Sequence, residues 1–312
     1  MEHQSLPIRH IRHAVEEAKK VIEEGMTGDQ QALFSRHPKI RKALLGGWRF
    51  NNVYIICGSS GAGKSYYLNM LYQDFCNPEL NKEFKKPFKI LHFAFEMSAY
   101  DEVLRATTSK SKIPYRNLLS ADNPLSQEDY AKALPHLDSL KENEIYFVET
   151  TGNVNQIEET VKYFQGKFPE HHIVVGMDHT LLPSYYTEKS EIELVANLAK
   201  VAIKIRKDYN CMVIFLNQLN SDIEERERIV NPAIHYPIKR DLFSSKQVYQ
   251  AADYVVVLHA PEQLGITSYG PHGYPTNGLI AWHLIKARKG HPGIIRLKNE
   301  LGEGNITEWK DE

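Results

Sequence analysis

The sequence predicts an α/β fold: a mostly parallel sheet with helices on both faces, extended by antiparallel strands at its C-terminal end. From residue 53 onward, short continuous apolar runs alternate with helical stretches, which is typical of buried parallel strands. The last apolar runs follow one another without long helices between them, which favours antiparallel neighbours. In addition, the first run leads directly into a glycine-rich turn and then a helix.

Before the sheet, the chain predicts an amphipathic helix over residues 10–24. Four apolar residues recur there at helical spacing with charges between them: Ile11, Val15, Ala18 and Ile22. A polar, glycine-containing stretch follows, so residues 1–35 are expected to form a helical linker segment and residues 36–312 the main domain. Two interpretations stay open: the helix packs on its own domain, or it docks on a neighbouring chain.

The elements of the main domain follow from the same patterns. Strands are expected at 53–57, 89–95, 144–150, 172–178, 211–218, 253–259, 279–287 and 294–298. Helices are expected at 64–75, 99–107, 126–140, 153–166 and 190–208. A charged stretch at 219–243 and a Gly- and Pro-rich stretch at 260–278 are expected to be loops.

Composition limits the classes of function. The 312 residues carry a net charge of −1, so no overall positive field attracts nucleic acid, and DNA binding would need local cations, backbone amides or a channel built from several subunits. The three cysteines match no metal or disulfide pattern, and the apolar runs around Cys57 and Cys211 predict buried thiols. The sequence contains no signal peptide and no run long enough to span a membrane, so a cytoplasmic location is expected, or the host cytoplasm for a viral protein.

Residues 58–65 carry the motif GxxxxGK[ST] between a predicted strand and a predicted helix, which is the context of a phosphate-binding P-loop. The motif consists of Gly58, Ser59, Ser60, Gly61, Ala62, Gly63, Lys64 and Ser65. Glycines let successive N–H groups point at phosphate oxygens, and the helix N-terminus adds positive partial charge. We expect the bound ligand to be ATP, with Lys64 on its β- and γ-phosphates and Ser65 on Mg²⁺.

Polar residues at the ends of other strands are candidates to complete this site. Asp178 ends a buried strand, where ligands of parallel sheets bind, and is expected to hold Mg²⁺ through a bound water; otherwise it caps the strand. Glu96 is a candidate to orient or deprotonate the attacking water, in competition with Glu149 and Asp178 itself. Gln218 is a candidate γ-phosphate sensor, and otherwise caps a loop.

Over residues 36–309 the order of elements resembles the RecA-like ATPase core of DnaB-type replicative helicases. The likeness is carried by HPKIRKALLGGWRFNNVYIICGSSGAGKS, HFAFEMSAYDEVLR, IVVGMDHTLLP, VIFLNQLNSDIEER, KRDLFSSKQVYQAADYVVVLH and HLIKARKGHPGIIRL. The resemblance implies that Glu96 rather than Glu149 is the catalytic carboxylate, that Asp178 is the acidic Mg²⁺ residue and that Gln218 is the sensor.

The same resemblance gives a role to the basic pair Lys286 and Arg288. In such rings ATP lies between subunits, and a basic pair of one subunit reaches the γ-phosphate held by its neighbour. A cation supplied across an interface in this way stabilises charge in the transition state. Without the resemblance, residues 286–290 would be interpreted as a solvated basic hairpin.

A ring of this kind would line its channel with loops at about residues 180–191 and 220–247. The cations expected to contact single-stranded DNA there are Arg226, Arg228, Lys239, Arg240 and Lys246. The first loop adds Tyr185, Tyr186 and Lys189. Phe243 either stacks on a base or, the preferred interpretation, packs within its loop. The alternative for the whole region is a surface loop of mixed charge.

The chain departs from the family in three places. Only about 45 residues precede the core, too few for a primase-binding domain, although the first helix could be the linker that docks on the adjacent subunit. After the Walker B strand the family usually carries Tyr-Leu-Gln, and this chain has His179, Thr180 and Leu181. In the DNA-contacting segment the family's Arg-Glu-Ser-Gly is replaced by residues 243–246, Phe-Ser-Ser-Lys.

Together these observations predict an ATP-hydrolysing DNA helicase motor. It is expected to form a homo-oligomer, most simply a hexameric ring, and to move along single-stranded DNA with 5′–3′ polarity, the polarity being implied by the resemblance alone. A loader or a primase is a candidate partner. Two rivals share the site: a RecA-like recombinase or loader-type DNA-dependent ATPase without unwinding, and a regulatory nucleotide-binding interaction module.

Overall fold

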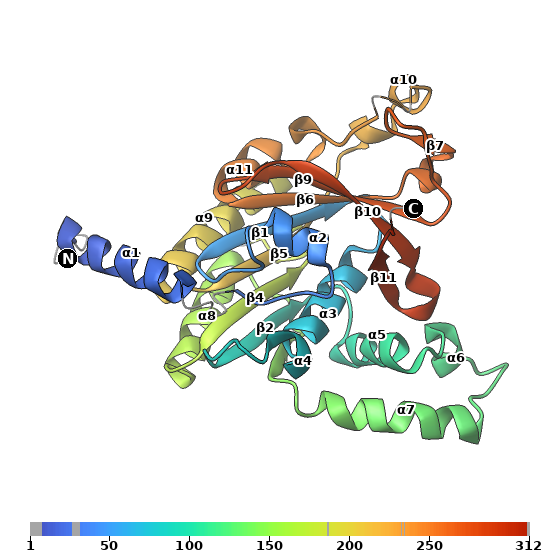
Figure 1. Cartoon of the computed structure of the whole chain (residues 1–312), viewed down its shortest axis with the longest axis horizontal. Coiled ribbons are helices and arrows are strands. Elements are labelled where there is room, and N and C mark those ends of the chain that lie inside the picture. The colour runs from blue at the N-terminus through green and yellow to red at the C-terminus, as the bar shows by residue number, and fades with distance from the viewer. Residues whose placement is uncertain (1–7, 27–31, 186, 232, 234, 311–312) are drawn as a thin grey trace.

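The computed structural model describes residues 8–26, 32–185, 187–231, 233 and 235–310. Its centre is a nine-stranded sheet in the order β11-β10-β9-β6-β1-β5-β4-β2-β3 (Figure 1). In chain order these strands are β1 Asn52–Gly58, β2 Phe88–Ala94, β3 Ile145–Val148, β4 His172–Asp178, β5 Met212–Gln218, β6 Tyr254–His259, β9 Leu279–Ala287, β10 Gly293–Glu300 and β11 Asn305–Glu308. A separate two-stranded sheet pairs β7 Ser268–Tyr269 with β8 Tyr274–Pro275.

The six strands from β6 to β3 in this order run parallel, and β9, β10 and β11 extend the sheet with antiparallel pairing. This confirms the predicted fold class. The predicted runs match the strands closely, but β11 was not expected from the sequence. Two strands, β5 and β4, lie between β1 and β2, so the chain crosses over them after the helix that follows β1. That crossover brings four strand ends to one edge in the order β1, β5, β4, β2.

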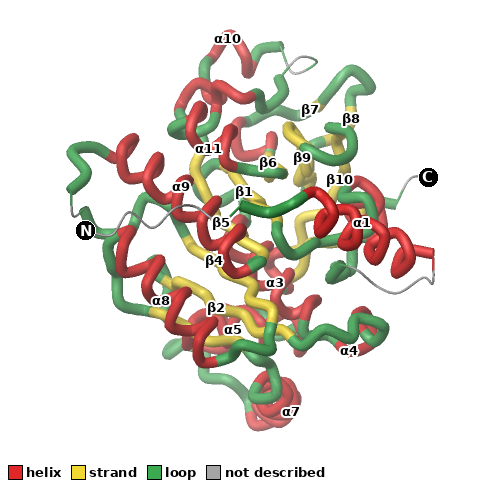
Figure 2. Tube along the Cα trace, turned by 90° about the vertical axis from the view of Figure 1, so that its left-hand side faces the viewer, coloured by secondary structure: helices red, strands yellow, loops and turns green. Residues whose placement is uncertain are grey.

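Helices cover both faces of the sheet, and Figure 2 shows the strands between α8 and α9 on one side and α3 on the other. One side carries α8 Val154–Lys167, α9 Glu191–Tyr209 and α11 Ser245–Ala251. The other side carries α2 Pro38–Ala43, α3 Lys64–Phe75, α4 Pro78–Asn81, α5 Ala99–Ser111, α6 Tyr115–Leu119 and α7 Gln127–Leu140. The long loops hold one further α-helix, α10 Arg226–Ile229, and the short 3-10 helices η1 Ser221–Glu224, η2 Lys239–Asp241 and η3 Pro261–Leu264; η4 Leu301–Glu303 precedes β11.

The central strands are buried on both faces, so each contributes side chains to two hydrophobic cores. In β1, Val53, Ile55 and Cys57 face α8 and α9, whereas Tyr54 and Ile56 face α3. Successive side chains of a strand point to opposite faces, which explains why the run is apolar throughout. Both cysteines expected to be buried, at positions 57 and 211, are buried free thiols.

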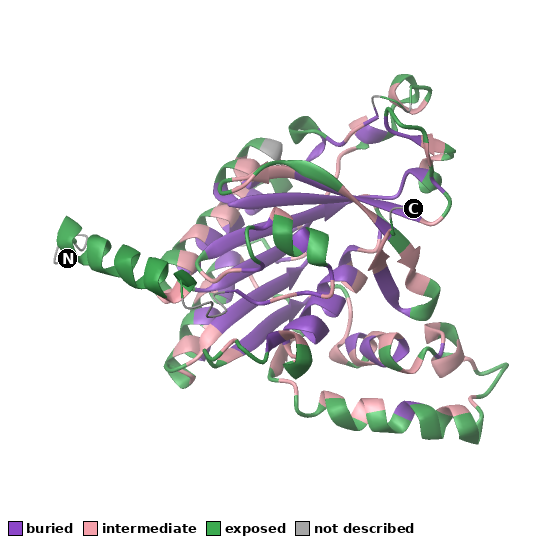
Figure 3. Ribbon diagram, viewed as in Figure 1, coloured by how far each residue is buried: buried purple, intermediate pink, exposed green. Residues whose placement is uncertain are grey.

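Helix α1 Ile11–Met26 projects away from the sheet, and none of its residues is buried (Figure 3). The structure therefore does not support the interpretation that this helix packs on its own domain. Its apolar residues remain accessible, with Val15 43% exposed and Ile22 63% exposed. Among the described residues, no helix is long and apolar enough to cross a bilayer.

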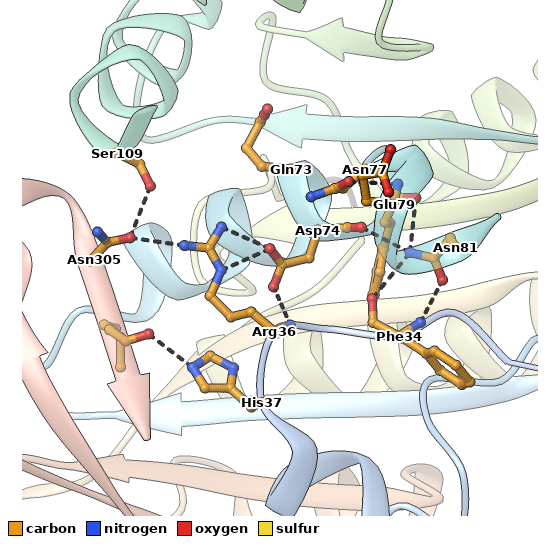
Figure 4. A network of polar contacts seen from close by, with 12 residues as sticks. Phe34, Arg36, His37, Gln73, Asp74, Asn77, Glu79, Asn81, Ser109 and Asn305 are labelled. Atoms are coloured by element: carbon orange, nitrogen blue, oxygen red, sulfur yellow. Dashed lines mark hydrogen bonds and ion pairs between the residues drawn. The ribbon is translucent and has the colours of Figure 1, made fainter. Parts of the chain in front are cut away.

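The packed body begins slightly before the expected boundary at residue 36. Leu33 exchanges two backbone hydrogen bonds of 2.8 Å with Trp48. Arg36 then forms an ion pair with Asp74 on α3 at 2.7 Å and donates to Asn305 on β11 at 2.8 Å (Figure 4). These contacts tie the segment that follows α1 to α3 and to β11, the last strand of the main domain.

Candidate nucleotide-binding site

The glycine-rich turn lies between β1 and α3, at the carboxyl edge of the parallel strands. Gly61 and Gly63 have φ of 76° and 87°, in the left-handed region where residues with a side chain are strained. A Cβ atom on Gly58 would lie 2.8 Å from the Leu258 carbonyl oxygen. The backbone therefore takes a course that glycine alone permits at these positions. The turn ends at Lys64, where the free N–H groups of the twelve-residue α3 begin.

Lys64 lies inside this turn and is largely buried. Its Nζ donates to the carbonyl oxygens of Gly58 and Ser59, both at 2.9 Å. Burial lowers the pKa of the amine, and the nearby carboxylate of Asp178 opposes the shift. A cation held by two carbonyls at the mouth of a turn of N–H groups is suited to bind an anion such as a phosphate.

Asp178 ends β4 and is 3% exposed. Burial raises the pKa of its carboxyl to about 7, and a hydrogen bond from the Ser65 hydroxyl partly offsets this shift. Its Oδ1 is buried without a hydrogen-bond partner. Such an orphaned oxygen beside a hydroxyl fits Mg²⁺, which proteins bind with one or two carboxylates while waters and phosphates complete the shell. No group of three or more His, Cys, Asp or Glu in the described part of the chain is arranged to hold a metal by itself.

Glu96 follows β2, whose last residue, Ala94, lies opposite Asp178. Its side chain is 51% exposed, and its Oε2 lies 3.9 Å from Nε2 of His179. The competing carboxylate is already engaged, because Oε1 of Glu149 accepts the backbone N–H of Ala99 at 2.8 Å. Of the two strand-end glutamates, Glu96 is therefore the one whose carboxylate is open toward the phosphate-binding turn.

Gln218 ends β5 opposite Gly58, so it lies beside the phosphate-binding turn. Its amide nitrogen lies 3.4 Å from Nε2 of His179. His179 is thus a neighbour of both Gln218 and Glu96, and sequence reasoning noted it only as a departure from the family. The position of His179 directly after Asp178 could have indicated that it belongs to the site. Its contacts could not be predicted, because they depend on three strands that are distant in sequence.

Lys286 and Arg288 lie at the opposite edge of the sheet, where antiparallel β9 ends. The backbone N–H of Arg288 donates to the Asp253 carbonyl at 2.8 Å, and that of Asp253 to the Val53 carbonyl at 2.8 Å. Arg288 therefore lies level with the first residues of β1, roughly 15 Å along the strand from the phosphate-binding turn. Within one chain the basic pair and the turn are kept apart by the length of the sheet.

Both cations of the pair are held near the surface by the end of α11 and the residue that precedes β6. Arg288 Nε lies 3.2 Å from Oδ1 of Asp253, and its side chain is 51% exposed. Lys286 Nζ lies 4.8 Å from the centre of the Tyr249 ring and donates to the Tyr249 carbonyl. Desolvation by burial lowers the pKa of Lys286, and the nearby Arg288 adds to this.

The loop cations expected to contact DNA divide into two groups. Arg226, Lys239, Arg240 and Lys246 are exposed. Arg228 is not: it forms an ion pair with Asp241 at 2.6 Å and donates to the Tyr236 carbonyl at 2.8 Å. With its side chain only 14% exposed, Arg228 is held within its own loop, an arrangement that does not support the expected contact with DNA.

The aromatic residues of the two loops also separate. Phe243 packs against the core beneath α9 and α11, as preferred from the sequence. Tyr185 is 52% exposed and Lys189 is exposed, whereas Tyr186 lies outside the described residues. In the described part of these two loops, the surface therefore offers separate exposed cations and the exposed ring of Tyr185, without a dense basic patch.

A cavity of about 500 Å³ lies apart from the phosphate-binding turn, next to the β7–β8 hairpin. It is lined by Tyr236, Tyr269, Tyr274, Arg296 and neighbouring residues of β9 and β10. None of the residues expected from the sequence to bind nucleotide, Mg²⁺ or DNA lines this cavity. The candidate site lies instead at the carboxyl edge of the parallel strands, between β1 and α3.

Two relatives with known descriptions match much of the chain. A "Probable replicative DNA helicase" of Trieres chinensis is 26% identical over 276 residues, covering 86% of this chain and 55% of that protein. The "Replicative DNA helicase DnaB" of Mycobacterium leprae (strain TN) is 23% identical over 238 residues, covering 74% of this chain and 37% of that protein. The chain thus spans about half the length, or less, of these relatives.

Two solved structures share the fold. One chain, described as an ATPase domain, superimposes with a TM-score of 0.82 at 17% identity, covering 97% of this chain and all of that one. A structure described as a DnaB-like replicative helicase and its interactions with primase superimposes with a TM-score of 0.78 at 16% identity, covering 99% of this chain and 68% of that one. These likenesses support a RecA-like core.

The family model described as "DnaB-like helicase C terminal domain" matches residues 39–306. The match takes in the glycine-rich turn, the four strand ends beside it and the basic pair at the far edge. It also agrees with the resemblance inferred from the sequence motifs. The chain therefore belongs to the family of DnaB-like helicase C-terminal domains.

Proposed function

We propose that the chain is the ATP-driven motor of a replicative DNA helicase, which hydrolyses ATP between adjacent copies and moves along single-stranded DNA to part the duplex. The observation that supports this most directly is the separation of two halves of one site. The phosphate-binding turn and the basic pair Lys286 and Arg288 lie at opposite edges of the same sheet. A head-to-tail ring brings the far edge of one copy to the near edge of the next.

In the proposed reaction each residue has a role set by its position. Lys64 and the N–H groups of the turn bind the β- and γ-phosphates, and Ser65 with Asp178 would hold Mg²⁺, which neutralises phosphate charge when bound. Glu96 orients the attacking water and accepts its proton, while Gln218 contacts the γ-phosphate. Arg288 and Lys286 of the adjacent copy stabilise charge on the transferred phosphoryl group, an effect of about 10³–10⁵ in rate in related systems.

The exposed helix α1 supports the ring in this proposal. Its apolar stripe finds no partner within the described part of its own chain, so docking on the adjacent copy would bury it. DNA would pass along the exposed cations Arg226, Lys239, Arg240 and Lys246 in the channel, with 5′–3′ polarity. A primase or loader would bind elsewhere on the ring.

Mixing two inactive variants tests the shared site. Lys64→Ala removes the phosphate cation, and Arg288→Ala removes the cation offered to the neighbour, so each variant alone should have little DNA-stimulated ATPase activity. In an equal mixture, about a quarter of the head-to-tail interfaces pair an intact turn with an intact Arg288, so activity should reappear. A mixture as inactive as its parts, under conditions where the wild-type ring forms, would contradict hydrolysis between copies.

Duplex unwinding must be measured beside ATPase activity, because two rival functions share the site. Displacement of a labelled strand by the wild-type chain, and its loss with Lys64→Ala, supports the helicase. Strand exchange or stable filament formation without displacement would instead favour a recombinase or loader-type ATPase. ATP binding without DNA-stimulated hydrolysis would favour a regulatory module.

A further inference from the structure

His179 contacts the two residues that we propose to act on the γ-phosphate and on water. Its Nε2 lies 3.4 Å from the side-chain amide of Gln218 and 3.9 Å from Oε2 of Glu96. Both neighbours are approached by one and the same atom of the ring. Any hydrogen bond that Nε2 makes to one of them is therefore denied to the other.

The other ring nitrogen fixes the tautomer. Nδ1 of His179 accepts the backbone N–H of Leu181 at 3.3 Å, so Nδ1 carries no proton. The proton of the neutral ring is therefore on Nε2, which is a donor. A donor needs an acceptor, and two lie nearby: the carboxylate of Glu96 and the side-chain amide of Gln218. Rotation of the Gln218 amide by 180° exchanges its oxygen and nitrogen, so that the oxygen can accept Nε2–H.

The ring is anchored, whereas the two acceptors have room to move. His179 is 8% exposed, and its carbonyl oxygen accepts the N–H of Leu182 at 3.2 Å. The next residue, Thr180, is fixed to β5 by two bonds, one to the Leu216 carbonyl at 3.0 Å and one to the Asn217 side chain at 2.9 Å. Glu96 is half exposed and Gln218 is partly exposed at the edge.

From this arrangement we propose that His179 is a positioning residue that gives its single Nε2–H to Gln218 or to Glu96, but not to both. The inference rests on the proposed function. When Gln218 turns to the γ-phosphate of ATP, the donor is released and holds the Glu96 carboxylate toward the attacking water. When the γ-phosphate has left, Gln218 takes the donor back and Glu96 swings free. His179 thereby links detection of the γ-phosphate to the readiness of the catalytic carboxylate.

Three variants of matched size test this role. His179→Gln keeps an amide N–H close to the place of Nε2, His179→Asn presents its amide near the place of Nδ1 instead, and His179→Phe keeps the ring without a donor. A hydrogen bond to a charged group corresponds to about a 10- to 100-fold effect on rate. We expect kcat for ATP to fall by that factor in the Phe and Asn variants and to recover largely in the Gln variant, with KM changed little.

If His179 had only a structural role, the Gln and Asn variants should have similar kcat values. Thermal unfolding and binding of a non-hydrolysable ATP analogue control for folding and for an intact phosphate site in each variant. Equal kcat in the Gln and Asn variants, or wild-type kcat in a folded Phe variant, would overturn the proposal.

A double variant tests whether His179 acts through Glu96. Because the His179 donor is proposed to affect hydrolysis only by holding the Glu96 carboxylate, His179→Phe in the Glu96→Ala background should lower kcat little beyond Glu96→Ala alone. Fully additive losses would overturn the proposal. The measurements need ATP hydrolysis only, so a wild-type chain that hydrolyses ATP without unwinding DNA would remove the helicase function and leave this test intact. A wild-type chain that hydrolyses no ATP would overturn both.

Discussion

At the residue scale, Asp178 combines a functional position with a cost in stability. A carboxyl that is 3% exposed resists ionisation, because charge is less favourable in a buried environment than in water. Its pKa is about 7 in the folded chain and has the ordinary value of 3.8 in the unfolded chain. Between these two pH values the folded chain therefore binds a proton that the unfolded chain has released. Mg²⁺ needs the ionised form, so the site that suits the ion destabilises the nucleotide-free protein.

Substitution of Asp178→Asn should therefore separate stability from activity. Because the folded-state pKa is raised, this carboxyl favours folding fully below pH 3.8, and that contribution is lost as pH rises toward 7. Without nucleotide or Mg²⁺, the free energy of unfolding should fall between pH 5 and 8 in the wild type. In the variant this fall should be smaller by about 1–3 kcal/mol. Denaturant unfolding at several pH values measures this, and identical pH profiles of wild type and variant would contradict it. Mg²⁺-dependent hydrolysis should be lost.

Gly176 lies within β4, the strand that ends at Asp178, and leaves room for the buried side chain of Tyr72. A Cβ atom there would lie 1.6 Å from the hydroxyl of Tyr72, which is buried and 3.0 Å from Nδ1 of His92. Gly176→Ala should lower the free energy of unfolding by about 1–3 kcal/mol through overpacking, and adding Tyr72→Phe should restore part of it. Gly166→Ala is the matched control, because a Cβ in that helix meets no atom within 4 Å and should be neutral or stabilising. Equal thermal shifts for both alanine variants would refute the packing argument.

The sequence carried residue-scale information unevenly. The glycine-rich turn is contiguous, so its spacing alone predicted the strand, the turn and the helix at Lys64. The residues alone left Glu96 and Glu149 as competing carboxylates, and the family resemblance favoured Glu96. The structure adds that Glu149 accepts the N–H of Ala99, a contact that no local pattern records. The ion pair of Arg228 with Asp241 was likewise not predictable, since both residues lie in the same charged loop and no periodicity reveals the pair. His179 gains its neighbours only through the order of β5, β4 and β2.

At the scale of elements, the long helices and most strands of the sheet were predictable, while the short helices α2, α4, α6, α10 and α11 and the order of the strands were not. Apolar runs gave the strands of the sheet to within a few residues because burial on both faces leaves a local imprint. The order β1, β5, β4, β2 comes from a crossover that no local pattern records. The short β11 pairs with the end of β10, and four half-polar residues give too weak a signal to predict it.

Helix α1 should contribute to the assembly of several copies but not to the stability of a single chain. Since none of its residues is buried, removing residues 1–26 should leave the thermal midpoint of the remaining chain unchanged at concentrations where it is monomeric. Assembly should weaken, because the apolar stripe is the surface offered to a second copy. Val15→Ser with Ile22→Ser tests the stripe, and Lys19→Ser with Glu23→Ser is the control on the polar side. Sedimentation at matched concentrations should show loss of large species only for the first pair.

At the scale of the whole molecule, the small net charge limits how the proposed DNA substrate could be bound. A single chain with net charge −1 and a few separate exposed cations lacks the positive field that draws in a polyanion. The proposed ring would repeat each cation around its axis, so the channel would be positive although each copy carries a net charge of −1. Binding of single-stranded DNA should therefore follow assembly, and conditions that give monomers should abolish both together.

This dependence gives a quantitative test. Native mass measurement should show a closed assembly, six copies by family resemblance, in the presence of ATP and single-stranded DNA. Arg240→Ala in that assembly should weaken DNA binding and reduce the slope of log affinity against log salt by about 0.7 for each phosphate that the arginine neutralises. Lys82→Ala is the matched control, because this exposed lysine directly follows α4 and belongs to neither loop. If the two variants lowered affinity equally, or if monomers bound DNA as tightly as the ring, the channel would not be the DNA-binding surface.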